Sequence, residues 1–174
     1  MRITCLVFVV ALGACTKGQH NVVQAPNGER LAAYKGVVVQ KVETGGWLAK
    51  NPRVRDNPAY SNWRSEIEMV ADQVPASAKK SFSECYEVRN EPGESAFVVQ
   101  SELVEFDPGS ADPLGGPSGR VAVRVVLVDG ASKEKIGEAQ VTATVGSASG
   151  LRGAYEECGL RIATFVIEHR PKPK

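Results

Sequence analysis

The chain has 174 residues, of which 43% are hydrophobic and 24% are charged, a composition typical of one folded domain and not of a disordered or fibrous protein. Its 21 basic residues nearly balance its 20 acidic residues, so we expect no nucleic-acid partner, because neutralising a phosphate backbone requires an excess of basic side chains. Two histidines and four cysteines leave little material for a metal cluster or a histidine-based catalytic triad.

An apolar segment opens the chain. After Met1 and Arg2, residues 3–11 are almost continuously apolar, which is the pattern of a secretion signal. The segment is shorter than the roughly 20 apolar residues that a helix needs to cross a bilayer, and polar residues 16–21 follow it. The sequence therefore predicts a signal peptide over residues 1–14 and no transmembrane anchor.

The signal segment ends in Leu12-Gly13-Ala14-Cys15, which resembles the lipobox of bacterial lipoproteins. In that class the cysteine becomes the acylated first residue of the mature chain, so the resemblance implies a lipidation site at Cys15, with covalent lipid (palmitate among the acyl chains) as the only attached group. The alternative is plain secretion with cleavage after Gly13, because ordinary signal peptidases accept small residues such as Ala11 and Gly13.

Lipid on Cys15 implies a bacterial cell-envelope protein. Thr16 stands where enteric lipoproteins that stay at the inner membrane carry Asp, which favours the outer membrane, with the domain facing the periplasm. Residues 15–30 are polar and show no hydrophobic period, so we expect the lipidated Cys and a flexible tether here.

Residues 31–170 are expected to form a single domain. Alternating apolar and polar residues predict strands over 34–43, 96–106, 120–129 and 136–145. Apolar residues at helical spacing predict helices over the ranges 58–74 and 151–169. Pro75 is expected to kink the first helix or to begin a second short one, because its ring clashes with the preceding turn.

The order β-α-β-β-β-α predicts the α+β class, a two-layer sandwich with a mixed, mostly antiparallel sheet and two helices packed on one face. Residues 171–174 are expected to be a frayed tail.

Three stretches of the expected domain carry a resemblance to a known group of proteins. They are Leu103-Val-Glu-Phe-Asp-Pro-Gly109, the glycine-rich 115–119, and Val125-Val-Leu-Val-Asp-Gly130 followed by Ile136-Gly137. The domain resembles small bacterial envelope lipoproteins of unknown function, and its implied fold is similar to curli-secretion-type and TolB amino-terminal domains. These motifs are turns and strand patterns, so the resemblance transfers no active residue.

Two cysteines fall on the apolar stripes of the two expected helices. If these helices pack side by side, Cys85 and Cys158 could meet, and an exported protein encounters an oxidising environment that favours a disulfide. Two separate buried thiols remain an alternative, as does a reactive or intermolecular thiol.

The other motifs carry little chemistry. The glycines of 115–119 lack the Gly-Lys-Ser/Thr of a phosphate loop, and Glu102, Glu105, Asp107 and Asp112 lack calcium-loop spacing, so we expect no metal site and no catalytic residue. A recognition patch is the hypothesis for Trp47, Arg53, Arg55 and Tyr60; the alternative is that Trp63 belongs to the core and Trp47 covers the sheet edge.

The sequence therefore predicts a lipid-anchored bacterial envelope lipoprotein, non-enzymatic, that acts as a periplasmic interaction or assembly domain. Its expected partners are the membrane, through the lipid, and another envelope protein, with homo-oligomers formed by pairing of strand edges as a further option. The alternative function is a periplasmic binding domain for a small ligand or a cell-wall fragment.

Overall fold

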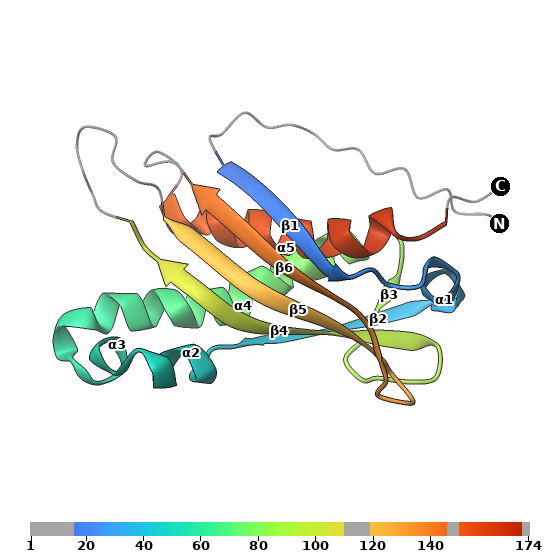
Figure 1. Ribbon diagram of the computed structural model, residues 1–174, viewed down its shortest axis with the longest axis horizontal. Helices are drawn as coiled ribbons and strands as arrows, with labels where there is room; N and C mark the ends of the chain where they lie inside the picture. The colour runs from blue at the N-terminus through green and yellow to red at the C-terminus, as the bar shows by residue number, and fades with distance from the viewer. Residues whose placement is uncertain (1–15, 110–118, 146–149, 172–174) are drawn as a thin grey trace.

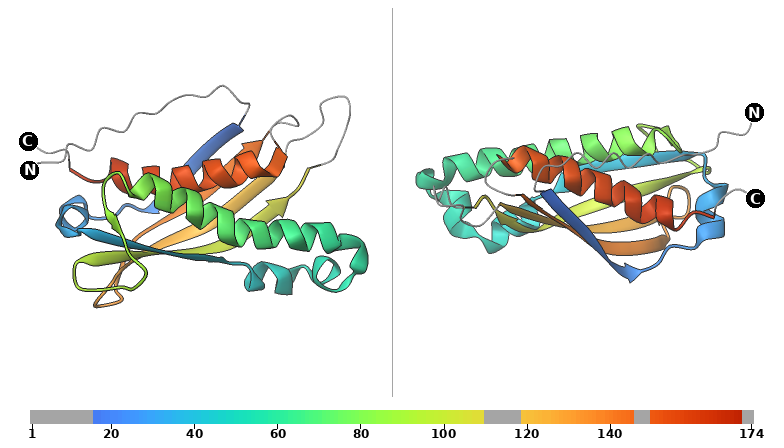
Figure 2. Two further views of the ribbon diagram at one scale, coloured as in Figure 1. Left: turned by 180° about the vertical axis from the view of Figure 1, so that it is seen from behind. Right: turned by 90° about the horizontal axis from the view of Figure 1, so that it is seen from above.

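The computed structural model describes residues 16–109, 119–145 and 150–171. One six-stranded sheet is built from β1 (Thr16–Gln24), β2 (Gly36–Glu43), β3 (Glu87–Val88), β4 (Ala96–Asp107), β5 (Arg120–Asp129) and β6 (Lys135–Val145). The helices are α1 (Gly28–Ala33), α2 (Gly45–Lys50), α3 (Pro52–Asp56), the 3-10 helix η1 (Pro58–Tyr60), α4 (Ser61–Phe82) and α5 (Gly150–Glu168). The two long helices, α4 and α5, lie on the same face of the sheet, which confirms the predicted α+β two-layer sandwich (Figures 1 and 2).

The strands follow the spatial order β1-β6-β5-β4-β2-β3. The pairs β1–β6, β6–β5 and β5–β4 are antiparallel, whereas β2 runs parallel to β4 and to β3. The parallel pair β2–β4 is connected by α4, since a parallel connection needs a crossover that returns the chain to the same end of the sheet. The sheet is therefore mixed and mostly antiparallel, as predicted.

The core lies between the sheet and the two long helices. The predicted inner face of β5 is fully buried, and so is most of the apolar stripe of α4. The residues concerned are Val121, Val123, Val125 and Leu127 on β5, and Ile67, Val70, Val74, Ala78 and Phe82 on α4. Burying each side chain of Val, Leu, Ile or Phe size contributes about 1.5–3 kcal/mol relative to exposure, so this layer dominates the stability of the fold.

Helices α4 and α5 run parallel to each other. Tyr155 Oη donates to Glu66 Oε2 at 2.6 Å near the start of both helices, and Ser77 Oγ donates to the Glu156 carbonyl at 2.7 Å further along. The helices approach closely at Gly159, where an added Cβ would come within 2.5 Å of Ser77 Cβ and of the Val74 carbonyl oxygen. A glycine is therefore required at this crossing.

Helix α4 continues through Pro75, so no second helix begins there and that alternative is wrong. Pro75 is itself buried in the stripe that packs on the sheet. The missing N–H costs one intrahelical hydrogen bond. Apolar packing on both sides of the proline, from Val74 to Ala78 and Phe82, keeps the chain helical because most helix stability in proteins comes from tertiary packing.

The prediction of a flexible tether over residues 15–30 is wrong for the described residues from 16 onward. Residues 16–24 form β1, which pairs with β6 from Thr16 opposite Val145 to Gln24 opposite Glu138. His20 lies against Phe165 of α5, with ring centroids 6.0 Å apart. The segment lacks an apolar alternation of its own because β1 is an edge strand, covered by α5 on one face only.

Residues 28–33 also form structure in place of a tether. Asn27 caps α1, its side chain accepting from the Arg30 N–H at 3.0 Å. Arg30 contacts Asp129 and Glu134 of the β5–β6 hairpin, and Tyr34 Oη donates to Asp129 Oδ2. Within the described residues, none of the helices combines the length and the apolarity that crossing a bilayer requires.

Candidate functional site: the uncovered face of the sheet

In the part of the chain that the structure describes, one face of the sheet has no long helix over it, because α4 and α5 both pack on the opposite face (Figure 2). Three valines on neighbouring strands form a small second cluster on this uncovered face, with Val126 packed beside them: Val38 of β2, Val98 of β4 and Val128 of β5. Val98 is paired with Val38 on one side and with Val128 on the other. Each valine is at most 8% exposed, because cross-strand neighbours shield one another.

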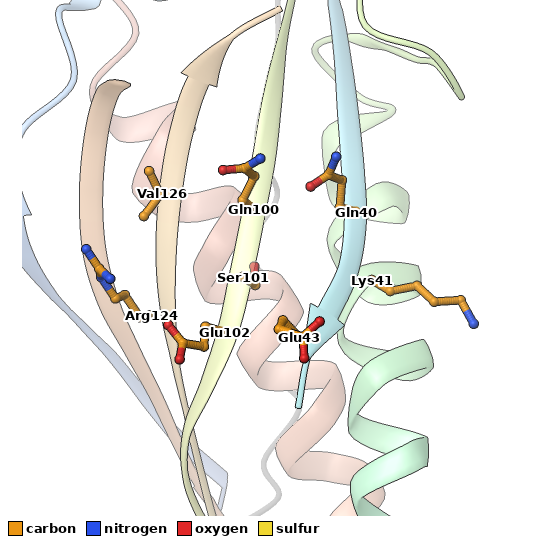
Figure 3. A pocket seen from close by; sticks show the side chains of 8 residues that line it. All are labelled: Gln40, Lys41, Glu43, Gln100, Ser101, Glu102, Arg124 and Val126. Atoms are coloured by element: carbon orange, nitrogen blue, oxygen red, sulfur yellow. The ribbon is translucent and has the colours of Figure 1, made fainter. Parts of the chain in front are cut away.

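A hollow of about 400 Å³ lies on the same face. Its lining comes from three adjacent strands: Gln40, Lys41 and Glu43 of β2, Gln100, Ser101 and Glu102 of β4, and Arg124 and Val126 of β5. Figure 3 shows Gln40 and Gln100 side by side on β2 and β4, with Glu43, Glu102 and Arg124 further along the strands and Lys41 pointing outward, away from the others.

A β-bulge in β2 shapes this hollow. Val39 pairs with Val99 and Val42 with Ser101, so two residues of β2, Gln40 and Lys41, stand opposite the single residue Gln100 of β4. The extra residue bends the strand locally, and such bulges often redirect side chains beside functional sites. The bulge explains why Gln40 faces the hollow while Lys41 turns outward to an ion pair with Asp72 of α4 at 2.7 Å.

Charges on this face are arranged across strands. Arg124 Nε donates to Glu138 Oε1 at 2.7 Å, and Lys135 Nζ donates to Glu138 Oε2 at 2.9 Å. These two bonds lower the pKa of Glu138 to about 2, so its carboxylate stays ionised at neutral pH. Glu102 stands opposite Arg124 on the other side. The guanidinium of Arg124 is thus held between two carboxylate-bearing strands.

The side chains of this arrangement can bind a polar ligand or partner. Amide, carboxylate and guanidinium groups supply both hydrogen-bond donors and acceptors, and Val126 adds an apolar contact. The lining residues include no histidine or cysteine, and Ser101 is 7% exposed. The described residues also contain no group of three or more His, Cys, Asp or Glu side chains that could hold a metal ion.

The hypothesis of a recognition patch is wrong for Trp47. This residue is 8% exposed and packs edge-on against Phe106 of β4, with ring centroids 6.1 Å apart. Its place in the core fits the alternative of a tryptophan that covers the sheet. Arg53 and Arg55 do lie on the surface, and Tyr60 is half-buried beside Trp63, with centroids 5.3 Å apart.

The predicted disulfide between Cys85 and Cys158 is also wrong, because Cys158 carries a free, fully buried thiol. The two helices pack side by side as expected, but their register separates the two residues. Cys158 adjoins Gly159, which faces Val74 and Ser77, whereas the Cys85 carbonyl accepts from Arg170 beyond the end of α5. Residues 158–168 span roughly 15 Å of helix.

Burial raises the pKa of the Cys158 thiol to about 12, so it is neutral at pH 7 and packs as a small apolar side chain. The predicted lipidation site, Cys15, lies outside the described residues, as do Asp112 and most of the glycine-rich stretch 115–119. Glu102, Glu105 and Asp107 are separated along β4, with Glu105 in an ion pair with Arg120 at 3.4 Å.

Sequence reasoning missed the residues of the hollow. The polar positions Gln100, Glu102 and Arg124 fall on predicted strands, and their alternation with buried neighbours was a usable signal for an open face. The orientation of Gln40 toward the uncovered face could not be predicted in this way. The β-bulge shifts the alternation of inward and outward side chains, and no residue pattern in the sequence identifies the bulge.

No protein-family model matches this chain, and no curated protein sequence does. Among solved structures, the chain is similar to PelC from Paraburkholderia phytofirmans, a dodecamer, with a TM-score of 0.57 and 16% identity over 86% of this chain and 97% of that one. A substituted form of the same dodecamer gives a TM-score of 0.55, 13% identity and the same coverage. A protein from Xanthomonas campestris gives a TM-score of 0.47, with 12% identity over 84% of this chain and 90% of that one. The similarity to PelC establishes a shared fold.

Proposed function

We propose that this chain is a bacterial cell-envelope lipoprotein, anchored through lipid on Cys15, whose α+β domain is a non-enzymatic assembly domain. The observation that carries the proposal is the uncovered sheet face, where a buried valine cluster adjoins a hollow lined by hydrogen-bonding side chains. The polar groups of this face can orient a partner, and the partly exposed Val126 adds an apolar contact.

The anchor part of the proposal rests on the sequence Leu12-Gly13-Ala14-Cys15. Several acyl chains on one residue hold a protein firmly at a membrane, because each buried methylene contributes about 0.8 kcal/mol. Thr16 at the following position supports the outer membrane, with the domain in the periplasm.

A second copy of the chain is the partner that we favour. The PelC structures with this fold are dodecamers, and homo-oligomers of small domains commonly use sheet faces and edges. Among the described strands, β1 lies at one edge of the sheet, and the side chains of Val22 and Val23 near its end are exposed. The uncovered face and this edge together provide two distinct surfaces, which a ring or a filament requires.

Metabolic labelling tests the anchor. Cells grown with radiolabelled palmitate are expected to incorporate label into the full chain and none into a Cys15→Ser variant. Incorporation into both forms, or into neither, would remove the anchor from the proposal.

Sedimentation velocity tests the assembly. The Cys15→Ser chain is expected to sediment as an oligomer at tens of micromolar, and Gln100→Arg, at the centre of the uncovered face, is expected to shift it to monomer. Gln73→Arg is the matched control, because Gln73 is an exposed glutamine on α4. A monomer in the unsubstituted chain, or equal dissociation in both variants, would contradict self-assembly through this face.

A second candidate function is the binding of a small ligand or a cell-wall fragment, which the hollow favours by its volume and mixed polarity. Titration of the 15N-labelled chain with peptidoglycan fragments would shift the amides of Gln100 and Glu102 before those of α4 if the hollow binds them.

A further inference from the structure

One end of the domain brings together segments that are far apart in the sequence. Strand β1 begins there, with Thr16 paired to Val145 at the end of β6. Strands β2 and β4 end there too, because they run in the same direction as β6. The short helices α2, α3 and η1 follow β2, and α4 begins directly after them, so they lie at this end as well (Figure 1). We call this the anchor end.

In the proposed function the lipid is attached at the anchor end, and no linker separates the lipidated residue from β1. Consecutive Cα atoms are about 3.8 Å apart, so an acylated Cys15 lies within about 4 Å of the first residue of β1. No tether separates the membrane from the folded domain, since pairing with β6 already includes Thr16. Figure 1 shows α3 and the first turn of α4 extending beyond the ends of the strands. With the proposed lipid on Cys15, the anchor end would face the bilayer.

One segment of the anchor end carries an excess of positive charge. The segment 44–64 contains four basic residues, Lys50, Arg53, Arg55 and Arg64, and one acidic residue, Asp56, while the acidic Glu43, Glu66 and Glu68 flank it in the sequence. Arg55 is held by Asp56, with N–O distances of 2.7 and 2.8 Å. Lys50 and Arg53 are exposed and have no ion-pair partner among the described residues.

Aromatic side chains at the anchor end suit a phospholipid surface. Tyr60 and Trp63 are half-buried and pack edge-on, with Trp63 in turn against Phe106, which fixes both rings at the base of α4. Amphipathic aromatic rings are favoured at the level of lipid headgroups, where one part is apolar and the other hydrated.

We infer that the anchor end docks on the headgroups of an anionic bilayer, with Lys50 and Arg53 contacting phosphates and Tyr60 lying at the same level. This inference rests on the proposed anchor at Cys15 for its orientation, but the surface has its own charge and aromatic content. Electrostatic attraction decays over about 10 Å at 0.1 M salt, so only cations at the end that faces the membrane contribute.

Vesicle sedimentation of the full chain carrying Cys15→Ser tests the docking surface without the lipid. At 25 mM salt, the bound fraction is expected to be at least threefold higher on vesicles of phosphatidylglycerol and phosphatidylethanolamine than on phosphatidylcholine alone, and to fall at 0.5 M salt. The Lys50→Gln/Arg53→Gln variant is expected to lose at least two thirds of the binding.

Lys80→Gln/Lys133→Gln is the matched control, because both lysines are exposed and lie away from the anchor end, after most of α4 and in the β5–β6 hairpin. Circular dichroism verifies that both double variants fold. No binding to the anionic vesicles at millimolar lipid, or an equal loss in both double variants, would overturn the inference. If the chain is not labelled by palmitate but still binds the anionic vesicles, the proposed lipid anchor is wrong and the proposed docking surface is supported.

Discussion

Single residues in this fold are constrained by the atoms of the neighbouring helix or strand that they contact. Gly159 has no side chain because Ser77 and the backbone of Val74 occupy the space. Glu138 is constrained by charge instead of space. Its carboxylate lies on the uncovered sheet face, is 8% exposed, and forms ion pairs with both Arg124 and Lys135. Neither constraint is visible in the local sequence, where both residues look replaceable.

We expect Gly159→Ala to lower the free energy of unfolding by about 1–3 kcal/mol, because the new methyl group would meet backbone atoms that cannot move away cheaply. This direction is opposite to helix propensity, which favours Ala over Gly by about 1 kcal/mol. Urea unfolding measures the change. Gly93→Ala is the control, since an added Cβ there meets nothing within 4 Å, and it is expected to change stability by less than about 0.5 kcal/mol. A stabilising Gly159→Ala would show that the helices separate easily.

Glu138 is expected to make stability depend on pH. Its pKa is lowered from 4.5 to about 2 by Arg124 and Lys135, so its stabilising contribution is complete above pH 4.5 and is lost as the pH falls toward 2. Urea unfolding of the natural chain and of Glu138→Gln should therefore give a stability difference at pH 7 that shrinks between pH 4.5 and pH 2. A difference independent of pH would mean that Glu138 acts by shape alone.

At the scale of elements, packing decides more than local propensity. Helix α4 passes through Pro75 without ending, and β1 forms from a segment that reads as a linker. Both depend on partners distant in sequence: the sheet beneath α4, and β6 and α5 beside β1. An edge strand needs only one buried face and one hydrogen-bonded neighbour, so its sequence can remain largely polar.

Hydrogen exchange distinguishes the edge strand from a tether. Amides of residues 16–24 that point toward β6 are expected to exchange more slowly than those on the free edge, giving an alternating pattern along β1, because only the former are hydrogen-bonded in the sheet. Exchange resolved by NMR measures this, with the fully solvated rates of the same residues as reference. Uniformly fast exchange over 16–24 would show that β1 does not pair in solution.

For the whole molecule, the sequence was informative where periodicity repeats over many residues. The four long strands, the two long helices and the class of the fold follow from patterns such as Val121 to Leu127 and Ile67 to Val74. What could not be predicted depends on register between elements: the separation of Cys85 from Cys158, and the bulge that opens the hollow at Gln40. A sequence encodes which residues are apolar, but the axial offset of two packed helices results from the sum of many contacts.

The direct passage from Cys15 into β1 also determines how the domain would respond to mechanical force. In the proposed anchored form, a pull on the lipid would reach the sheet through Thr16 before any other described residue. Hydrogen bonds between β1 and β6 lie across the strand axis, so a force directed along that axis loads them together in shear, whereas a sideways force would open them one after another. If the domain is held end-on at a membrane as proposed, it would be pulled along its strands, and the register from Thr16 to Gln24 would share that load across its whole length.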